Sequence, residues 1–213
     1  MVSYVSEAYE SLPSLREAAN QFNEKQAKTY LLGPIRQLFL DSGAHERYGI
    51  SLLHKHFSME ANQRLVDFRN ISAPWTVNDN DDFVVPKYEG FIIPRTFRFF
   101  HGNLTPFEFD FSSSSPSHRD ADREFLQELS ALLHQHGLED ILGVRSLDRY
   151  DSDLSVEVTE GKANIMIPRG SVKESELIEA FWVFGPYNLQ KCHCREYCWK
   201  TSEGKHLEDH GCS

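Results

Sequence analysis

The sequence has no cysteine before residue 192, and its four cysteines all lie within the C-terminal stretch KCHCREYCWKTSEGKHLEDHGCS. This distribution excludes a disulfide framework through the body of the chain. A domain of 213 residues is also large enough to bury a core without such crosslinks. Cysteines that gather in a short stretch of an intracellular chain are more typical of metal binding than of a disulfide scaffold.

Long apolar runs are absent too. No stretch approaches the roughly 20 apolar residues that a membrane span requires. The N-terminal residues MVSYVSEAYESLPSLREAANQF lack the basic region and apolar run of a signal peptide. We therefore expect a soluble, cytoplasmic protein with no membrane partner.

Positive charge is scarce. The chain has 22 Lys and Arg against 32 Asp and Glu, which gives a net charge of −10, and the basic residues form no cluster. This charge repels phosphate backbones and therefore disfavours nucleic acid as a partner. The 40% hydrophobic content, with 15 Phe, supplies ample core.

Several catalytic motifs are missing. The sequence has no Gly-rich phosphate loop, no G-x-S-x-G elbow and no H-E-x-x-H helix. Few strand–helix–strand units are visible, which argues against a parallel nucleotide-binding sheet. We therefore expect an α+β fold with N-terminal helices, a central antiparallel β meander, a helix–hairpin–helix unit and a Cys/His-rich C-terminal tail.

The N-terminal half changes from helical to strand periodicity near residue 49. Ser14 and Glu17 have the spacing of a capping box, and the helix that follows should be interrupted at Gly33-Pro34. A second short helix should stop at Gly43. Residues 49–57 alternate with period two and predict a strand paired with residues 65–71.

The meander should continue through several aromatic-rich strands between residues 83 and 111. The dipeptide Gly102-Asn103 predicts a hairpin turn between the last two of them. The run of phenylalanines in these strands is most simply the buried face of the sheet.

The C-terminal half should contain two helices around a hairpin. Asp120 or Asp122 should cap an amphipathic helix that ends at Gly137, and Glu160-Gly161 should turn a hairpin. A capping box at residues 171–174 predicts a last helix, whose buried residues would be Leu177, Ile178, Phe181 and Trp182.

Three parts follow from this organisation. Residues 1–111 form the N-terminal helices and the meander, and residues 118–190 form the helix–hairpin–helix unit on the same core. Residues 191–213 form the metal-binding tail. The serine-rich residues 112–117 are the connector.

The tail carries ligands suited to zinc. Its spacing is Cys194-x3-Cys198-x7-His206-x3-His210, and thiolate and imidazole are the donors that a structural zinc site prefers. Cys192 or Cys212 could replace one of the histidines as a ligand. The other interpretation is an unliganded tail, or a cysteine pair that forms on oxidation.

A second candidate site lies at His54 and His56. Residues two apart on a strand share a face, so the two imidazoles could bind a second metal, or one could act as a general base. Glu60 could complete such a site and His101 could join it. The stretch resembles the first motif of the cupins, in which a His-x-His pair is followed by a glutamate, and this implies an iron, manganese or nickel ion. His101 does not fit the second cupin motif, and a histidine pair on a solvent-facing strand remains the simpler interpretation.

Two segments carry a further resemblance. GISLLHKHF and the RLVDF strand, together with a Cys/His tail, resemble uncharacterised predicted proteins of filamentous fungi. The resemblance implies a fungal cytoplasmic protein and transfers no activity.

Two functions remain open from the sequence. The first is a small-molecule enzyme with a histidine-lined pocket in the meander. The second is a non-catalytic adaptor with zinc in its tail. An enzyme should bury the His54–His56 pair in a concave site, whereas an adaptor should leave it exposed or simply packed.

The serine-rich connector generates the first testable prediction. Residues 112–117 offer little apolar surface to offset the entropy lost on ordering. Limited proteolysis followed by mass spectrometry should therefore find the first cuts there or in the acidic residues 78–82. First cuts within residues 125–133 would contradict this division of the chain.

Overall fold

The computed structural model describes residues 4–69, 71–77, 89–113, 122–147, 155–168, 178–185, 194–200 and 206–212. For residues 155–158, 166–168, 194–200 and 206–212 it describes the backbone alone. The helices are α1 (Ser6–Glu10), α2 (Leu15–Glu24), α3 (Ala27–Tyr30), the π-helix η1 (Leu31–Ile35), α4 (Arg36–Asp41), the 3-10 helix η2 (Ala44–Glu46) and α5 (Arg123–Gln135). The strands are β1 (Tyr48–Leu52), β2 (Gln63–Phe68), β3 (Ile71–Thr76), β4 (Phe91–Phe100), β5 (Asn103–Ser112), β6 (Leu142–Ser146), β7 (Ser155–Glu160), β8 (Ala163–Pro168), β9 (Glu179–Trp182), β10 (Cys194–Lys200) and β11 (His206–Cys212).

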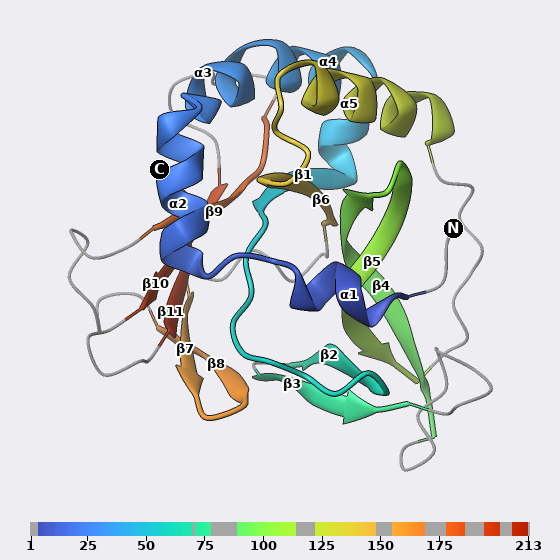
Figure 1. Ribbon diagram of the computed structural model, residues 1–213, viewed down its shortest axis with the longest axis vertical. Coiled ribbons are helices and arrows are strands. Elements are labelled where there is room, and N and C mark those ends of the chain that lie inside the picture. Colours follow the sequence, from blue (N-terminus) through green and yellow to red (C-terminus); the bar gives the residue numbers. More distant parts are fainter. Residues whose placement is uncertain are drawn as a thin grey trace.

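The fold is α+β, as the sequence predicted. The strands close into a barrel in the order β1-β6-β4-β5-β2-β3-β8-β7-β11-β10-β9. Helices α3, α4 and α5 lie together at the top of Figure 1, and the β2–β3 and β7–β8 hairpins lie at the opposite end. No helix in the described ranges combines the length and the apolar character needed to cross a bilayer.

Several predicted helix boundaries depend on local chemistry and are confirmed, but the helix after Ser14 already ends at Glu24, and Asp122 precedes α5 without a side-chain capping hydrogen bond. The Ser14 hydroxyl accepts the Glu17 N–H at 3.4 Å, and the Glu17 carboxylate accepts the Ser14 N–H at 2.9 Å. Gly43 and Gly137 follow α4 and α5 with φ of 68° and 62°, a conformation that glycine adopts without strain. The predicted interruption at Gly33-Pro34 is also confirmed, because Gly33 has a non-helical φ of −100° and ψ of −108° and the chain kinks there within η1.

The strands separate two apolar cores. Along β4, Phe97 and Arg98 point to opposite faces because side chains alternate along a strand. Phe97 packs with α2, α4 and α5 in the larger core. Arg98 instead donates hydrogen bonds to the Ala8 carbonyl and the Ser11 hydroxyl of the α1 region, both at 2.9 Å. The second core, which contains Tyr9 of α1 and Phe107 and Phe109 of β5, lies on that side.

The predicted partner of the first strand is wrong. β1 pairs with β6 and β9, whereas β2 pairs antiparallel with β3 and parallel with β5. Residues 49–52 of β1 are buried without interruption, so the sequence pattern does not show which strand lies beside β1.

The predicted turn between β4 and β5 is displaced by one residue. His101 and Gly102 have φ of 49° and 73° and form the two-residue turn, and Phe100 opposes Asn103.

The last predicted helix is wrong for Glu179–Trp182, which form β9. Ala180, Phe181 and Trp182 are all buried, so the strand carries apolar residues on both faces and shows no period of two. The rest of that predicted helix, up to Leu177, lies outside the described residues, as do residues 114–121 of the connector region. The amphipathic helix and the β7–β8 hairpin are present as predicted.

Close packing at β6 generates a stability prediction. A Cβ at Gly143 would meet the Phe97 carbonyl oxygen and stand 2.6 Å from Leu53 Cδ2. Because the first of these atoms is backbone, Gly143→Ala should lower the free energy of unfolding by about 1–3 kcal/mol. Chemical denaturation measures this, and Ser146→Ala on the same strand should stay within about 0.5 kcal/mol of the wild type. Equal stabilities for the two variants would contradict the packing.

Candidate functional site

The chain leaves β1 after Leu52 and runs beside α1 before it reaches β2 (Figure 1). Its backbone is held from two sides along this path. The Leu53 N–H donates to the Ile141 carbonyl at 2.8 Å, and the Lys55 N–H donates to the Pro13 carbonyl at 2.8 Å. The segment that carries both predicted histidines is therefore fixed although it is not part of a regular strand.

Tyr9 of α1 supports this segment from within the second core. Its side chain is fully buried, and its hydroxyl accepts the Phe57 N–H at 3.5 Å. The backbone N–H of His56 is a second hydrogen-bonding partner of the same hydroxyl. Burial raises the pKa of Tyr9, and the charges of Glu108 and Glu10 raise it further. The phenol therefore stays neutral and serves as a fixed hydrogen-bonding group.

Glu10, the next residue of α1, anchors the same segment by its carboxylate. One carboxylate oxygen accepts the Met59 N–H at 2.6 Å, and the other lies 3.3 Å from the Lys55 ammonium. The Lys55 ammonium also donates to the Glu10 carbonyl at 2.8 Å. Two consecutive residues of α1 thus bind both ends of residues 55–59.

The His54 ring is buried and held in one orientation. Only 6% of the residue is exposed, and Nδ1 lies 2.9 Å from the Leu52 carbonyl oxygen. A carbonyl oxygen can only accept, so Nδ1 carries the proton and the acceptor atom of the neutral ring is Nε2. Histidines that bind metal ions commonly have this arrangement, in which the other ring nitrogen donates to a backbone carbonyl.

The rings of His54 and His56 lie side by side. Their centroids are 4.7 Å apart and their planes meet at 67°. Two imidazole nitrogens on one tetrahedral zinc ion, each at about 2.0–2.1 Å, place ring centroids roughly 5 Å apart. The prediction that the two rings lie together is confirmed. The reason given for it is wrong, because β1 ends at Leu52 and both histidines follow it.

The other two residues predicted for this site lie elsewhere. Glu60 is exposed, and its backbone N–H donates to the Gln63 side chain at 3.0 Å. His101 is exposed in the β4–β5 turn, with its ring 4.1 Å from the ring of Phe100. No group of three or more His, Cys, Asp or Glu that could hold a metal ion is found among the residues the structure describes.

The carboxylates of β5 have separate partners. The Thr96 hydroxyl donates to Glu108 at 2.5 Å, whereas Asp110 accepts from Arg95 at 3.0 Å. Arg95 also lies 3.1 Å from Asp67 of β2. These two acids are therefore bound into the sheet and do not form a catalytic pair with each other.

The four predicted zinc ligands of the tail lie on β10 and β11. Cys194 and Cys198 are on β10, and His206 and His210 are on β11, which pairs with it antiparallel. Cys194 opposes Cys212, which the sequence had offered as a substitute ligand. The side chains of these residues lie outside the described part of the structure.

Sequence reasoning missed Tyr9 and Glu10. They belong to a helix of five residues, too short to show a helical period in the sequence. Their role depends on contacts with residues more than 40 positions away. No signal in the sequence indicated these contacts.

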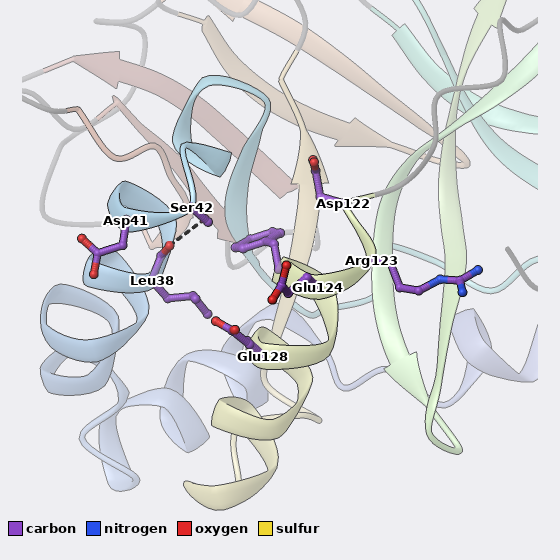
Figure 2. A pocket seen from close by; sticks show the side chains of 8 residues that line it. Leu38, Asp41, Ser42, Asp122, Arg123, Glu124 and Glu128 are labelled. Carbon is purple, nitrogen blue, oxygen red and sulfur yellow. Dashed lines mark hydrogen bonds between the residues drawn. The ribbon is translucent and has the colours of Figure 1, made fainter.

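A separate cleft lies between α4 and α5, with a volume of about 580 Å³ (Figure 2). Its polar walls are mainly carboxylates, and the side chain of Arg123 points away from the others. The residues that line it are Leu38, Asp41, Ser42, Asp122, Arg123, Glu124, Phe125 and Glu128. The cleft attracts cations by its charge, but its acids do not converge on one point as ligands of a metal ion would.

Comparisons with known proteins find no matching family model, no similar curated protein and no similar solved structure. The arrangement of the residues is therefore the basis for assigning a function.

The Tyr9 environment generates a pH prediction. A phenol whose pKa is raised on folding stabilises the folded state below the unfolded pKa of about 10, and this contribution is lost as the pH rises above it. Tyr9→Phe removes the ionisable group, so its free energy of unfolding should fall less steeply than that of the wild type between pH 9 and 11. Urea denaturation at each pH measures the difference, and parallel curves would show that Tyr9 does not contribute.

The same substitution tests the hydrogen bonds at neutral pH. Phenylalanine leaves a partly buried backbone N–H without its acceptor, so the free energy of unfolding of Tyr9→Phe should fall by about 1–3 kcal/mol at pH 7. Tyr30→Phe, in the other core, is the matched control and should lose less. A Tyr9→Phe protein as stable as Tyr30→Phe would contradict the role assigned to the hydroxyl.

Proposed function

We propose that this protein binds a divalent transition-metal ion through His54 and His56 and uses that site on a small-molecule substrate. The observation that carries the proposal is the position of the two rings, whose centroids are 4.7 Å apart. Imidazole is the nitrogen ligand that zinc, nickel and copper share.

The surroundings of the pair support the proposal. The Leu52 carbonyl orients the His54 ring and makes Nε2 the acceptor. α1 holds the backbone of His56, Phe57 and Met59, so little reorganisation is needed on binding. A site that is held in place before it is occupied loses less free energy to ordering.

The small number of protein ligands at the His54–His56 site favours a catalytic role for the ion over a purely structural one. Structural zinc sites are closed by four protein ligands, whereas sites with fewer protein ligands keep positions for water and substrate. A metal ion held in this way supplies a Lewis acid and lowers the pKa of bound water. Leu53, next to His54 in the chain, belongs to the second core, so the pair borders an apolar region that strengthens electrostatic interactions at a bound ion.

Metal titration of paired variants tests the proposal. The experiment uses the full-length chain with all four cysteines replaced by serine, so that only nitrogen and oxygen ligands remain. Isothermal titration with Ni²⁺ or Zn²⁺ should give about one equivalent per chain. His54→Ala and His56→Ala should each weaken binding by at least about tenfold, because each removes one ligand.

His101→Ala and Glu60→Ala are the matched controls, since these residues lie away from the pair. Both should bind as tightly as the parent chain. Binding that survives the double variant His54→Ala/His56→Ala would overturn the proposal. No titration by the double variant, together with metal binding by the chain that keeps its cysteines, would instead be expected of both sites acting independently. Metal binding only in the chain that keeps its cysteines would fit the alternative function, a non-catalytic adaptor with a metal site in its tail.

A further inference from the structure

The antiparallel register of β10 and β11 determines which of the tail cysteines and histidines lie next to each other in space. Cys194 opposes Cys212, Glu196 opposes His210, Cys198 opposes Glu208, and Lys200 opposes His206. Residues directly opposite in an antiparallel pair share a face, and so do residues two apart on one strand. All eight of these positions therefore fall on one face of the hairpin.

Distance along the strand separates the two cysteines of β10. At about 3.3 Å per residue, positions 194 and 198 are roughly 13 Å apart. Thiolate sulfurs bind zinc at about 2.3 Å, so two cysteines that share one ion must have their backbones much closer together than this separation along β10. Cys194 and Cys198 therefore do not share one metal ion while β10 stays extended.

Cys194 and Cys212 are placed quite differently. The backbones of directly opposed residues lie about 4.5–5.5 Å apart in an antiparallel pair. His210 is two positions before Cys212 on the same face, and it is the diagonal neighbour of Cys194 at roughly 7–8 Å. These three positions form one compact group at the end of the hairpin.

We propose that Cys194, Cys212 and His210 form a metal site for zinc or another ion of similar preference, and that Cys198 and His206 are not ligands. Two thiolates and one imidazole are donors that zinc prefers, and Glu196, which opposes His210 on the same face, is placed to supply the fourth ligand of a closed structural site. The site joins the first residue of β10 to the last residue of β11. Because this hairpin connects β9 to β7 and completes the barrel, the metal stabilises the closure of the barrel.

The site is independent of the His54–His56 site. It draws on thiolates, which the histidine pair lacks, so spectroscopy distinguishes the two. Co²⁺ bound by Cys194 and Cys212 should show thiolate-to-metal charge-transfer absorption, whereas Co²⁺ bound by His54 and His56 should not.

The test uses the full-length chain loaded with Co²⁺ under a phosphine reductant. Cys212→Ser, Cys194→Ser and His210→Ala should each remove the charge-transfer band or lower the apparent affinity for Co²⁺ by at least about tenfold. Cys198→Ser is the matched control, since it removes one thiol from the same face of the same strand. It should keep both the band and the affinity, as should His206→Ala.

Loss of the band in Cys198→Ser with retention in Cys212→Ser would overturn the proposal in favour of the set Cys194, Cys198, His206 and His210. No band in the parent chain would overturn it outright. The histidine-pair proposal is untouched by either result, because it is measured in a chain without cysteines.

A second measurement keeps the inference testable if a variant fails to fold. After chelation, exchange with oxidised glutathione converts two adjacent thiols into a disulfide and releases two molecules of reduced glutathione. Peptide mapping should find Cys194 linked to Cys212. A dominant Cys194–Cys198 link would overturn the register on which the site depends.

Discussion

The backbone N–H groups between Leu52 and β2 need acceptors, and α1 supplies several of them. A buried polar group without a partner costs free energy, so the chain can leave the sheet here only if something replaces the strand ladder. The Tyr9 hydroxyl and the Glu10 carboxylate do this for Phe57 and Met59. The position of His56, and with it the geometry of the histidine pair, depends on these contacts.

α1 can do this because the sheet holds it in turn. Arg98 is 4% exposed and donates to the Ala8 carbonyl, one residue before Tyr9. Burial lowers the pKa of this guanidinium, and Asp140, 3.0 Å away, offsets part of the effect. A buried cation is costly unless it is paired and hydrogen-bonded, and the two Nη atoms of Arg98 find such partners in the Ala8 carbonyl, the Ser11 hydroxyl and the Asp140 carboxylate. β4 thus fixes α1, and α1 fixes the histidine segment.

Local features of the fold could be predicted from the sequence, and long-range ones could not. The capping box at Ser14 and Glu17 and the glycines after α4 and α5 act within a few residues, and each was identified correctly. The pairing of β1 with β9 joins residues about 130 positions apart. Both strands are buried on both faces, so neither shows the alternation from which a partner could be inferred.

The histidine site lies between these two cases. His54 and His56 are two apart, and their proximity needed only short-range reasoning. Their orientation did not follow from strand alternation, since β1 has already ended. It follows from the Leu52 carbonyl that holds the His54 ring and from the Tyr9 hydroxyl that holds the backbone of His56, contacts that the fold creates.

The two proposed metal sites use different ligand types and lie in different parts of the chain. All the thiols lie at the C-terminus, while the histidine pair sits next to a core without a cysteine. Thiolate donors suit an ion that stays bound and closes a hairpin, whereas neutral imidazoles leave more positive charge on the ion to activate water. The net charge of −10 favours cations over the whole surface, including the α4–α5 cleft. Geometry and ligand type, rather than overall charge, therefore decide where an ion is retained.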